Sequence, residues 1–159
     1  MYRTKDSSSY LKTIKKILEV LEQLQGSQIN LEAKYTLADE LELVDKSYRY
    51  LKLFLPETNE KVDSILQNIR DETKQLEHLV LLPSHRDFYD KQILLDGKKL
   101  TVIDWDTFAM ADPTLDFGNF TAHLKLRALQ FPDLAPIFNK AEKLLEEKIS
   151  GRERKHTKT

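Results

Sequence analysis

The sequence predicts a mainly α domain, of the α+β class, that contains one small β-hairpin. Three observations support this prediction: helical spacing of apolar residues up to about Glu77, two short β-rich runs on either side of Asp96-Gly97, and further helical spacing from Asp116 onward. A chain of 159 residues is long enough for one domain with a real hydrophobic core. We therefore expect a single domain over residues 1–150, followed by a disordered basic tail at residues 151–159.

Three helices are predicted before residue 78, because apolar residues repeat there at spacings of three and four. The first runs from Tyr10 to Leu24 and stops at Gly26. The second runs from Leu37 to Leu55, just before Pro56, and the third runs from about Thr58 to Leu76. We interpret the three apolar stripes as helix surfaces that face the core.

A β-hairpin is predicted where the runs Ile93–Leu95 and Leu100–Ile103 flank an Asp-Gly turn. If the chain turns midway between Gly97 and Lys98, cross-strand partners have residue numbers that sum to about 195, and they lie about 5 Å apart. Gln92 is then opposite Ile103, and Lys91 is opposite Asp104. The polar loop before the first strand therefore meets the acidic end of the second strand, at what we call the mouth of the hairpin.

The last third of the chain is predicted to be helical. One helix is expected from Asp116 to about Leu129, where Pro132 and Pro136 interrupt the pattern, and a last helix is expected from roughly Ala135 to Ile149.

Composition narrows the classes of function. Lysine and arginine number 25 against 26 acidic residues, so the chain lacks the concentrated basic charge that nucleic-acid binding requires. The absence of cysteine excludes disulfides, thiolate metal sites and a cysteine nucleophile. The N-terminus lacks the apolar run of a secretory signal, and no segment approaches the roughly 18 apolar residues of a membrane span. We expect a cytoplasmic protein without membrane association.

The mouth of the hairpin carries residues suited to phosphoryl transfer. A Gln92 oxygen and the Asp104 carboxylate are placed to share one hard cation, and magnesium prefers oxygen ligands and takes only one or two from the protein. Asp87 lies in the loop that enters the mouth, five residues before Gln92. A carboxylate there can accept the hydrogen bond of an attacking hydroxyl, which is what phosphoryl transfer requires of the protein.

Three motifs lie between positions 85 and 116. His85–Gln92 reads His-Arg-Asp followed by an amide residue five positions after the Asp, and resembles a kinase catalytic loop. Val102–Asp106 resembles the kinase magnesium-binding segment in an Ile-Asp-Trp form, and Asp112–Asp116 reads Asp-Pro-x-x-Asp. Together they resemble the aminoglycoside phosphotransferase and choline kinase-like family. The resemblance implies the helical C-terminal lobe of a protein-kinase-like fold, with its catalytic core at residues 78–131.

The resemblance also implies roles for individual residues. Asp87 would be the catalytic carboxylate, and Asp104 the principal magnesium ligand that also reaches the nucleotide phosphates. Gln92 stands where the family usually has asparagine, and is expected to supply a second metal contact. Asp116 is expected to cap the following helix and brace the catalytic loop. Structural support is expected from His85, Arg86, Asp112 and Asp116. Asp106 is either a secondary metal contact or a surface acid.

The function implied by the resemblance is transfer of the γ-phosphate of ATP (or GTP), with Mg²⁺, to a hydroxyl of an aminoglycoside, amino alcohol or sugar. The first 77 residues show no strand lysine with an acidic partner, so the N-terminal nucleotide-binding lobe is expected to be absent and the chain to be incomplete or weakly active alone. An inert lobe that serves as an interaction module, or one half of a split enzyme, is the alternative. An uncovered cleft would favour self-association or a partner chain that supplies the missing lobe.

Two further classes stay open from the residues alone. His85, Asp87 and Asp104 are a candidate zinc or iron set for a metal-dependent hydrolase. A helical interaction protein with an incidental acidic mouth is the non-enzymatic reading.

Overall fold

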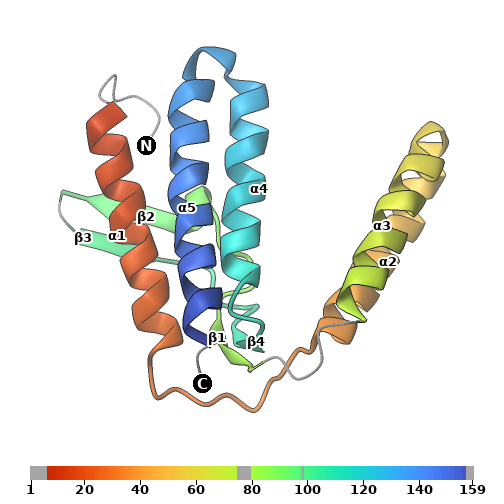
Figure 1. Cartoon of the computed structure of the whole chain (residues 1–159), viewed down its shortest axis with the longest axis horizontal. Coiled ribbons are helices and arrows are strands. Elements are labelled where there is room, and N and C mark those ends of the chain that lie inside the picture. Colours follow the sequence, from red (N-terminus) through yellow and green to blue (C-terminus); the bar gives the residue numbers. More distant parts are fainter. Residues whose placement is uncertain (1–6, 75–79, 98, 157–159) are drawn as a thin grey trace.

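Three helices form the body of the molecule: α1 (Ser7–Gln25), α4 (Leu115–Gln130) and α5 (Ala135–His156). The computed structural model describes residues 7–74, 80–97 and 99–156, with the backbone alone for 151–156. The three helices stand side by side, and strands lie behind them in the view of Figure 1. This arrangement confirms the predicted mainly α architecture with little β-structure.

The core lies between these helices and the loop that precedes β2. On α1 the predicted stripe faces the core, since Ile14 and Leu21 have no exposed surface. Helix α1 ends where predicted, and the Gly26 N–H donates to the Glu22 carbonyl at 2.8 Å. The buried cluster comprises Tyr10, Ile14, Ile17, Leu18, Leu21, Phe88, Ile93, Phe117, Phe120, Leu124, Phe138, Ala141 and Leu145.

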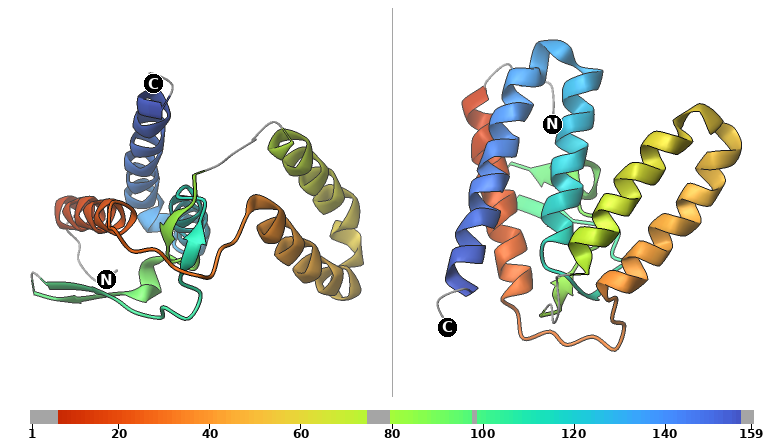
Figure 2. Two further views of the ribbon diagram at one scale, coloured as in Figure 1. Left: turned by 90° about the horizontal axis from the view of Figure 1, so that it is seen from below. Right: turned by 45° about the vertical axis from the view of Figure 1, so that its right-hand side comes forward.

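Helices α2 (Leu37–Phe54) and α3 (Asn59–Thr73) form a helical hairpin that projects away from the body (Figures 1 and 2). A short 3₁₀ turn at Pro56–Thr58 joins them. Thr36 begins α2 with a capping box, in which its hydroxyl accepts the Asp39 N–H and the Asp39 carboxylate accepts the Thr36 N–H. The third predicted helix reached Leu76, which lies outside the described residues.

The prediction that the apolar stripes of α2 and α3 face the core is wrong for much of this helical hairpin. Tyr48 on α2 and Leu66 on α3 are buried as predicted. Val44, Leu51, Ile65 and Ile69 belong to the same stripes and are exposed. The physical reason is that α2 and α3 pack mainly against each other, and two helices alone can cover only the strip along which they touch.

The predicted β-hairpin is confirmed, including its register. Strand β2 (Ile93–Asp96) pairs antiparallel with β3 (Lys99–Val102), and the numbers of each pair sum to 195. The Ile103 N–H donates to the Gln92 carbonyl at 3.0 Å, which places Gln92 opposite Ile103. Gly97 has a φ of 56°, the left-handed conformation that the turn needs and that glycine adopts without strain.

A second small sheet was not predicted. Strand β1 (Leu82–Ser84) pairs antiparallel with β4 (Ala109–Ala111). The connection between α1 and α2 runs along β4: the Met110 N–H donates to Ala33, and the Tyr35 N–H donates to Met110, both at 2.9 Å. The sheet therefore brings the start of the projecting hairpin beside the loop that follows β1.

Helices α4 and α5 begin close to their predicted starts, with a 3₁₀ turn at Pro132–Leu134 between them. Helix α5 continues through His156, past the predicted end at Ile149. Residues 151–156, which were expected to belong to a disordered tail, are therefore helical, while 157–159 lie outside the described residues. Within the described part of the chain, no helix combines the length and apolar character that crossing a membrane requires.

Candidate active site

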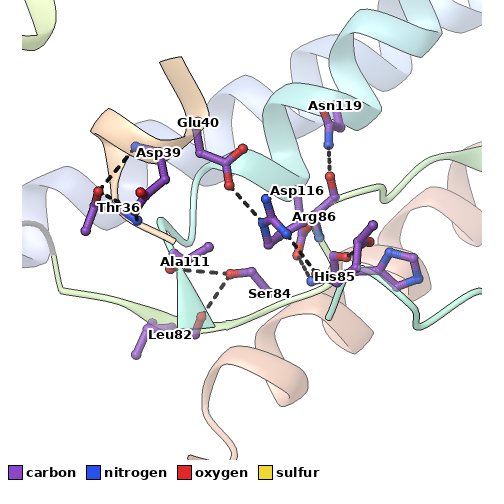
Figure 3. Close-up of polar contacts among 11 residues, drawn as sticks. Thr36, Asp39, Glu40, Leu82, Ser84, His85, Arg86, Ala111, Asp116 and Asn119 are labelled. Carbon is purple, nitrogen blue, oxygen red and sulfur yellow. Dashed lines mark hydrogen bonds and ion pairs between the residues drawn. The ribbon is translucent and has the colours of Figure 1, made fainter. Parts of the chain in front are cut away.

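The backbone turns sharply at Arg86, directly after β1. Arg86 has a φ of 69°, a left-handed conformation that is uncommon for a residue with a side chain. Asp116 holds this turn, because its carboxylate accepts the His85 N–H at 2.9 Å and the Arg86 N–H at 2.8 Å (Figure 3). The Asn119 amide on α4 donates to the Arg86 carbonyl at 2.8 Å. Helix α4 thus fixes the turn that leads into Asp87.

Asp116 is fully buried and differs in one respect from its expected role. It does not cap α4, because the helix begins after Thr114, which makes no side-chain capping bond, and the Asp116 carboxylate faces the loop instead. Burial raises the pKa of Asp116, and the two backbone N–H donors partly oppose that shift. Asp112 shapes the preceding turn, where its carboxylate accepts both the N–H and the hydroxyl of Thr114.

His85 packs beneath the loop. Its ring is fully buried, and its Nε2 lies 2.9 Å from the Ile103 carbonyl, so Nε2 is the protonated nitrogen. The ring also packs against Trp105 and Phe88, with centroids 4.9 and 5.7 Å away. His85 therefore connects the loop before Asp87 to the end of β3, and its Nε2 donates to a carbonyl.

The structure brings Asp87, Gln92 and Asp104 together at the mouth. The Gln92 side-chain nitrogen donates to an Asp87 oxygen at 3.1 Å and to an Asp104 oxygen at 2.9 Å. Gln92 is buried, Asp87 is half-buried and Asp104 is exposed. Asp104 itself has a φ of 66°, and Arg86, which directly precedes Asp87, also has a positive φ. Such conformations cluster at functional sites, where surrounding contacts hold them.

The neighbouring acids lie in different surroundings. Asp106 is exposed and takes part in no hydrogen bond or ion pair among the described residues. Asp90 is buried, and one of its carboxylate oxygens lies 3.4 Å from Arg127 on α4. This contact anchors the 3₁₀ turn Asp90–Gln92 to the body, and thereby positions Gln92 at the mouth. The sequence pattern gave no indication of this pair, since its members are 37 positions apart.

The side chain of Arg86 has partners that the sequence could not identify by residue. Its Nε donates to Glu40 of α2 at 2.8 Å, and its Nη1 donates to the Thr107 carbonyl at 3.2 Å. The guanidinium carbon lies 3.4 Å from the centroid of the Tyr35 ring. Glu40 is 46 positions from Arg86, beyond the reach of any local spacing rule.

The alternative of a zinc or iron hydrolase receives no support from this geometry. Across the described ranges, no group of three or more histidine, aspartate or glutamate side chains is arranged to hold a metal ion. His85, the nitrogen ligand considered for such a site, points its Nε2 at a carbonyl.

Comparison with known proteins assigns most of the chain to one group. A model of a phosphotransferase enzyme family matches residues 3–145, a span that includes all of the candidate site residues. No curated protein and no solved structure gives a significant match.

Proposed function

The chain belongs to the phosphotransferase enzyme family, and from that premise we propose that it is a catalytic lobe that transfers the γ-phosphate of ATP to a hydroxyl of a small molecule. One observation carries the proposal: a single buried amide, that of Gln92, lies within hydrogen-bond distance of both Asp87 and Asp104. The residue suited to the attacking hydroxyl and the residue suited to the metal therefore share one small site.

The donor set at the mouth fits magnesium. The Gln92 nitrogen stands between two carboxylate oxygens, a position that favours positive charge. Rotation of the amide by half a turn presents its oxygen instead, so that Gln92 and Asp104 both offer oxygen ligands, which magnesium prefers. Asp104 and Gln92 would hold the ion. When bound, magnesium neutralises charge on the transferred phosphate group.

Asp87 is proposed to act on the acceptor. Its carboxylate is half-buried at the mouth, and the rigid turn at Arg86 fixes the backbone that precedes it. In phosphoryl transfer such a carboxylate orients the attacking hydroxyl and accepts its proton. The resemblance of the motifs between residues 85 and 116 favours an aminoglycoside, amino alcohol or sugar as the acceptor.

Turnover by the isolated chain is expected to be slow. Asp104 and Trp105 are exposed, so water reaches the metal side of the mouth. Electrostatic stabilisation of a transferring phosphate is strong only where water is excluded. The assay should therefore be run under single-turnover conditions, with the chain in excess over ATP.

Phosphorus NMR of the chain with ATP, Mg²⁺ and a panel of hydroxyl acceptors tests the proposal. We expect ADP to form together with one new phosphoester, and Asp87→Asn to slow the reaction by about 100-fold or more, the usual contribution of a positioned acid or base. Asp133→Asn, which alters an exposed acid in the turn before α5, should leave the rate unchanged. Equal rates for Asp87→Asn and the unaltered chain, or no ADP at all, would contradict the proposal.

The surface of the projecting hairpin supports a second candidate, an interaction module or one half of a split enzyme. Tyr50, Leu53 and Phe54 are 66%, 76% and 77% exposed. Large apolar side chains grouped in this way mark association surfaces. Sedimentation velocity over a range of concentrations should then show association that Phe54→Glu weakens. A single monomeric species at every concentration would argue against self-association.

A further inference from the structure

The projecting hairpin meets the body at a narrow joint. The backbone of residues 33–35 pairs with Met110 just before α2 begins, and Figures 1 and 2 both show the two helices leading away from that point. Among side chains of the described residues, one hydrogen-bonded ion pair links α2 or α3 to the rest of the chain. That pair is Glu40–Arg86, whose nitrogen and oxygen atoms are 2.8 Å apart.

This ion pair is more buried than the others on the hairpin. The side chains of Arg86 and Glu40 are 8% and 20% exposed, whereas those of Lys52 and Asp63 are 38% and 54% exposed. The Arg86 guanidinium also stacks on Tyr35 and donates to the Thr107 carbonyl. A planar guanidinium held on several sides has little freedom to reorient, unlike the usual solvated surface pair.

The backbone of the same arginine belongs to the catalytic loop. Arg86 adopts the left-handed conformation directly before Asp87, and α4 holds its N–H through Asp116 and its carbonyl through Asn119. Figure 3 shows these contacts converging on one residue from two sides, with Glu40 on one and Asp116 and Asn119 on the other. Helix α4 therefore holds the backbone of Arg86 through hydrogen bonds, and α2 holds its side chain through the ion pair with Glu40.

We propose that Glu40 is a positioning residue, through which the placement of the α2–α3 hairpin sets the orientation of Asp87 at the mouth. Asp87 follows Arg86 in the chain, and it shares the Gln92 amide with Asp104. A change in the Arg86 side chain moves Asp87 relative to that amide. The catalytic consequence of this inference rests on the proposed function, whereas the structural coupling does not.

A positioning role of Glu40 can be distinguished from a role that only stabilises the fold. An ion pair that only fastens the hairpin to the body would affect stability and leave the mouth unchanged. A positioning pair changes the mouth even in a chain that stays folded. The side-chain NH₂ group of Gln92 is a direct reporter, because it donates to both Asp87 and Asp104.

The test compares three variants by ¹H–¹⁵N NMR. Glu40→Ala removes the acceptor for Arg86 Nε; Glu40→Gln removes the charge but keeps an oxygen acceptor; Asp63→Asn breaks the Lys52–Asp63 pair elsewhere on the hairpin. We expect Glu40→Ala to shift the Gln92 side-chain NH₂ signals and the Asp87 and Asp104 amides, Glu40→Gln to shift them less, and Asp63→Asn to leave them in place. Dispersed spectra establish that each variant is folded.

Changes confined to residues 33–73 and Arg86 in both Glu40 variants would overturn the inference. The transfer reaction gives a kinetic test. Glu40→Ala should lower the single-turnover rate constant at saturation about 10-fold or more and leave the Kd for ATP within about twofold, since misplacing a catalytic group by about 1 Å can reduce the rate about 100-fold. Equal losses in Asp63→Asn would also overturn it. If the unaltered chain shows no transfer, the proposed function fails. The NMR comparison still decides whether Glu40 is structurally coupled to Asp87 at the mouth.

Discussion

Asp116 shows at the scale of one residue how the loop before Asp87 is held. Its carboxylate is the acceptor for two backbone N–H groups, and it has no exposed surface. We predict that Asp116→Ala destabilises the chain by about 3 kcal/mol, because a buried donor left without a partner costs about 1–3 kcal/mol. Asp133→Ala, at an exposed acid without such contacts, should change the free energy of unfolding by less than about 0.5 kcal/mol. Urea unfolding measures both, and equal values would contradict this role.

The ionisation of Asp116 gives a second prediction. Burial raises its pKa in the folded chain above the ordinary carboxyl value that it has when unfolded. Between those two pKa values the folded state binds more protons than the unfolded state. The stability contributed by this group is therefore present at low pH and decreases as pH rises through that interval. Carboxyl ¹³C titration should place the Asp116 pKa above the usual range; a value at or below that range would show that the N–H donors outweigh burial.

At the scale of elements, the body and the projecting hairpin should respond differently to the same substitution. Leu21 on α1 has no exposed surface, whereas Leu53 on α2 is 76% exposed. Leu21→Ala removes packed atoms from the core and should cost about 2–5 kcal/mol of stability. Leu53→Ala should change it by less than about 0.5 kcal/mol. Chemical denaturation of the two variants measures this contrast, and a large loss from Leu53→Ala would mean that the hairpin surface is covered.

Helix boundaries and the hairpin register could be predicted because both depend on neighbours in sequence. Gly26 and Pro56 end helices locally, and the Asp96-Gly97 turn fixes which residues of β2 and β3 face each other. Periodicity also identifies an apolar face on α2 and α3. Periodicity does not tell which element packs against that face, and for this reason the predicted burial of Val44 and Ile65 was wrong.

The end of α5 was mispredicted for a related reason. The residues after Ile149 include no apolar side chain to bury, and the helix was therefore predicted to end there. The observed helix continues to His156. Backbone hydrogen bonds within a helix need no apolar partner, so continuation costs little once the helix has formed.

At the scale of the whole molecule, the candidate site is partly local and partly long-range. Asp87, Gln92 and Asp104 could be placed together because the loop and hairpin that carry them are continuous in sequence. The residues that hold this loop in place could not be predicted, because they come from elements that are distant in sequence. Glu40 reaches Arg86 from α2, and Arg127 reaches Asp90 from α4. Only the folded arrangement shows that both helices converge on this short loop.

The overall shape places these supports in two different parts of the molecule. The body holds the loop through Asp116, Asn119 and Arg127, whereas the projecting hairpin holds it through Glu40. Anything that binds the exposed apolar surface of the hairpin therefore acts on an element that contacts the loop carrying Arg86 and Asp87. We accordingly expect ligands of the mouth and occupants of the hairpin to influence each other's binding.

Thermal unfolding with magnesium, with ATP, with both and with neither tests the central claim most directly, when the unaltered chain is compared with Asp104→Ala. Ligand at about 100 times its dissociation constant adds about 2.7 kcal/mol of stability, which raises Tm by about 5–10 °C in a domain of this size. The account predicts a rise that requires both magnesium and ATP and is lost in Asp104→Ala. No rise with both ligands, or an equal rise in Asp104→Ala, would contradict a magnesium–nucleotide site at this mouth.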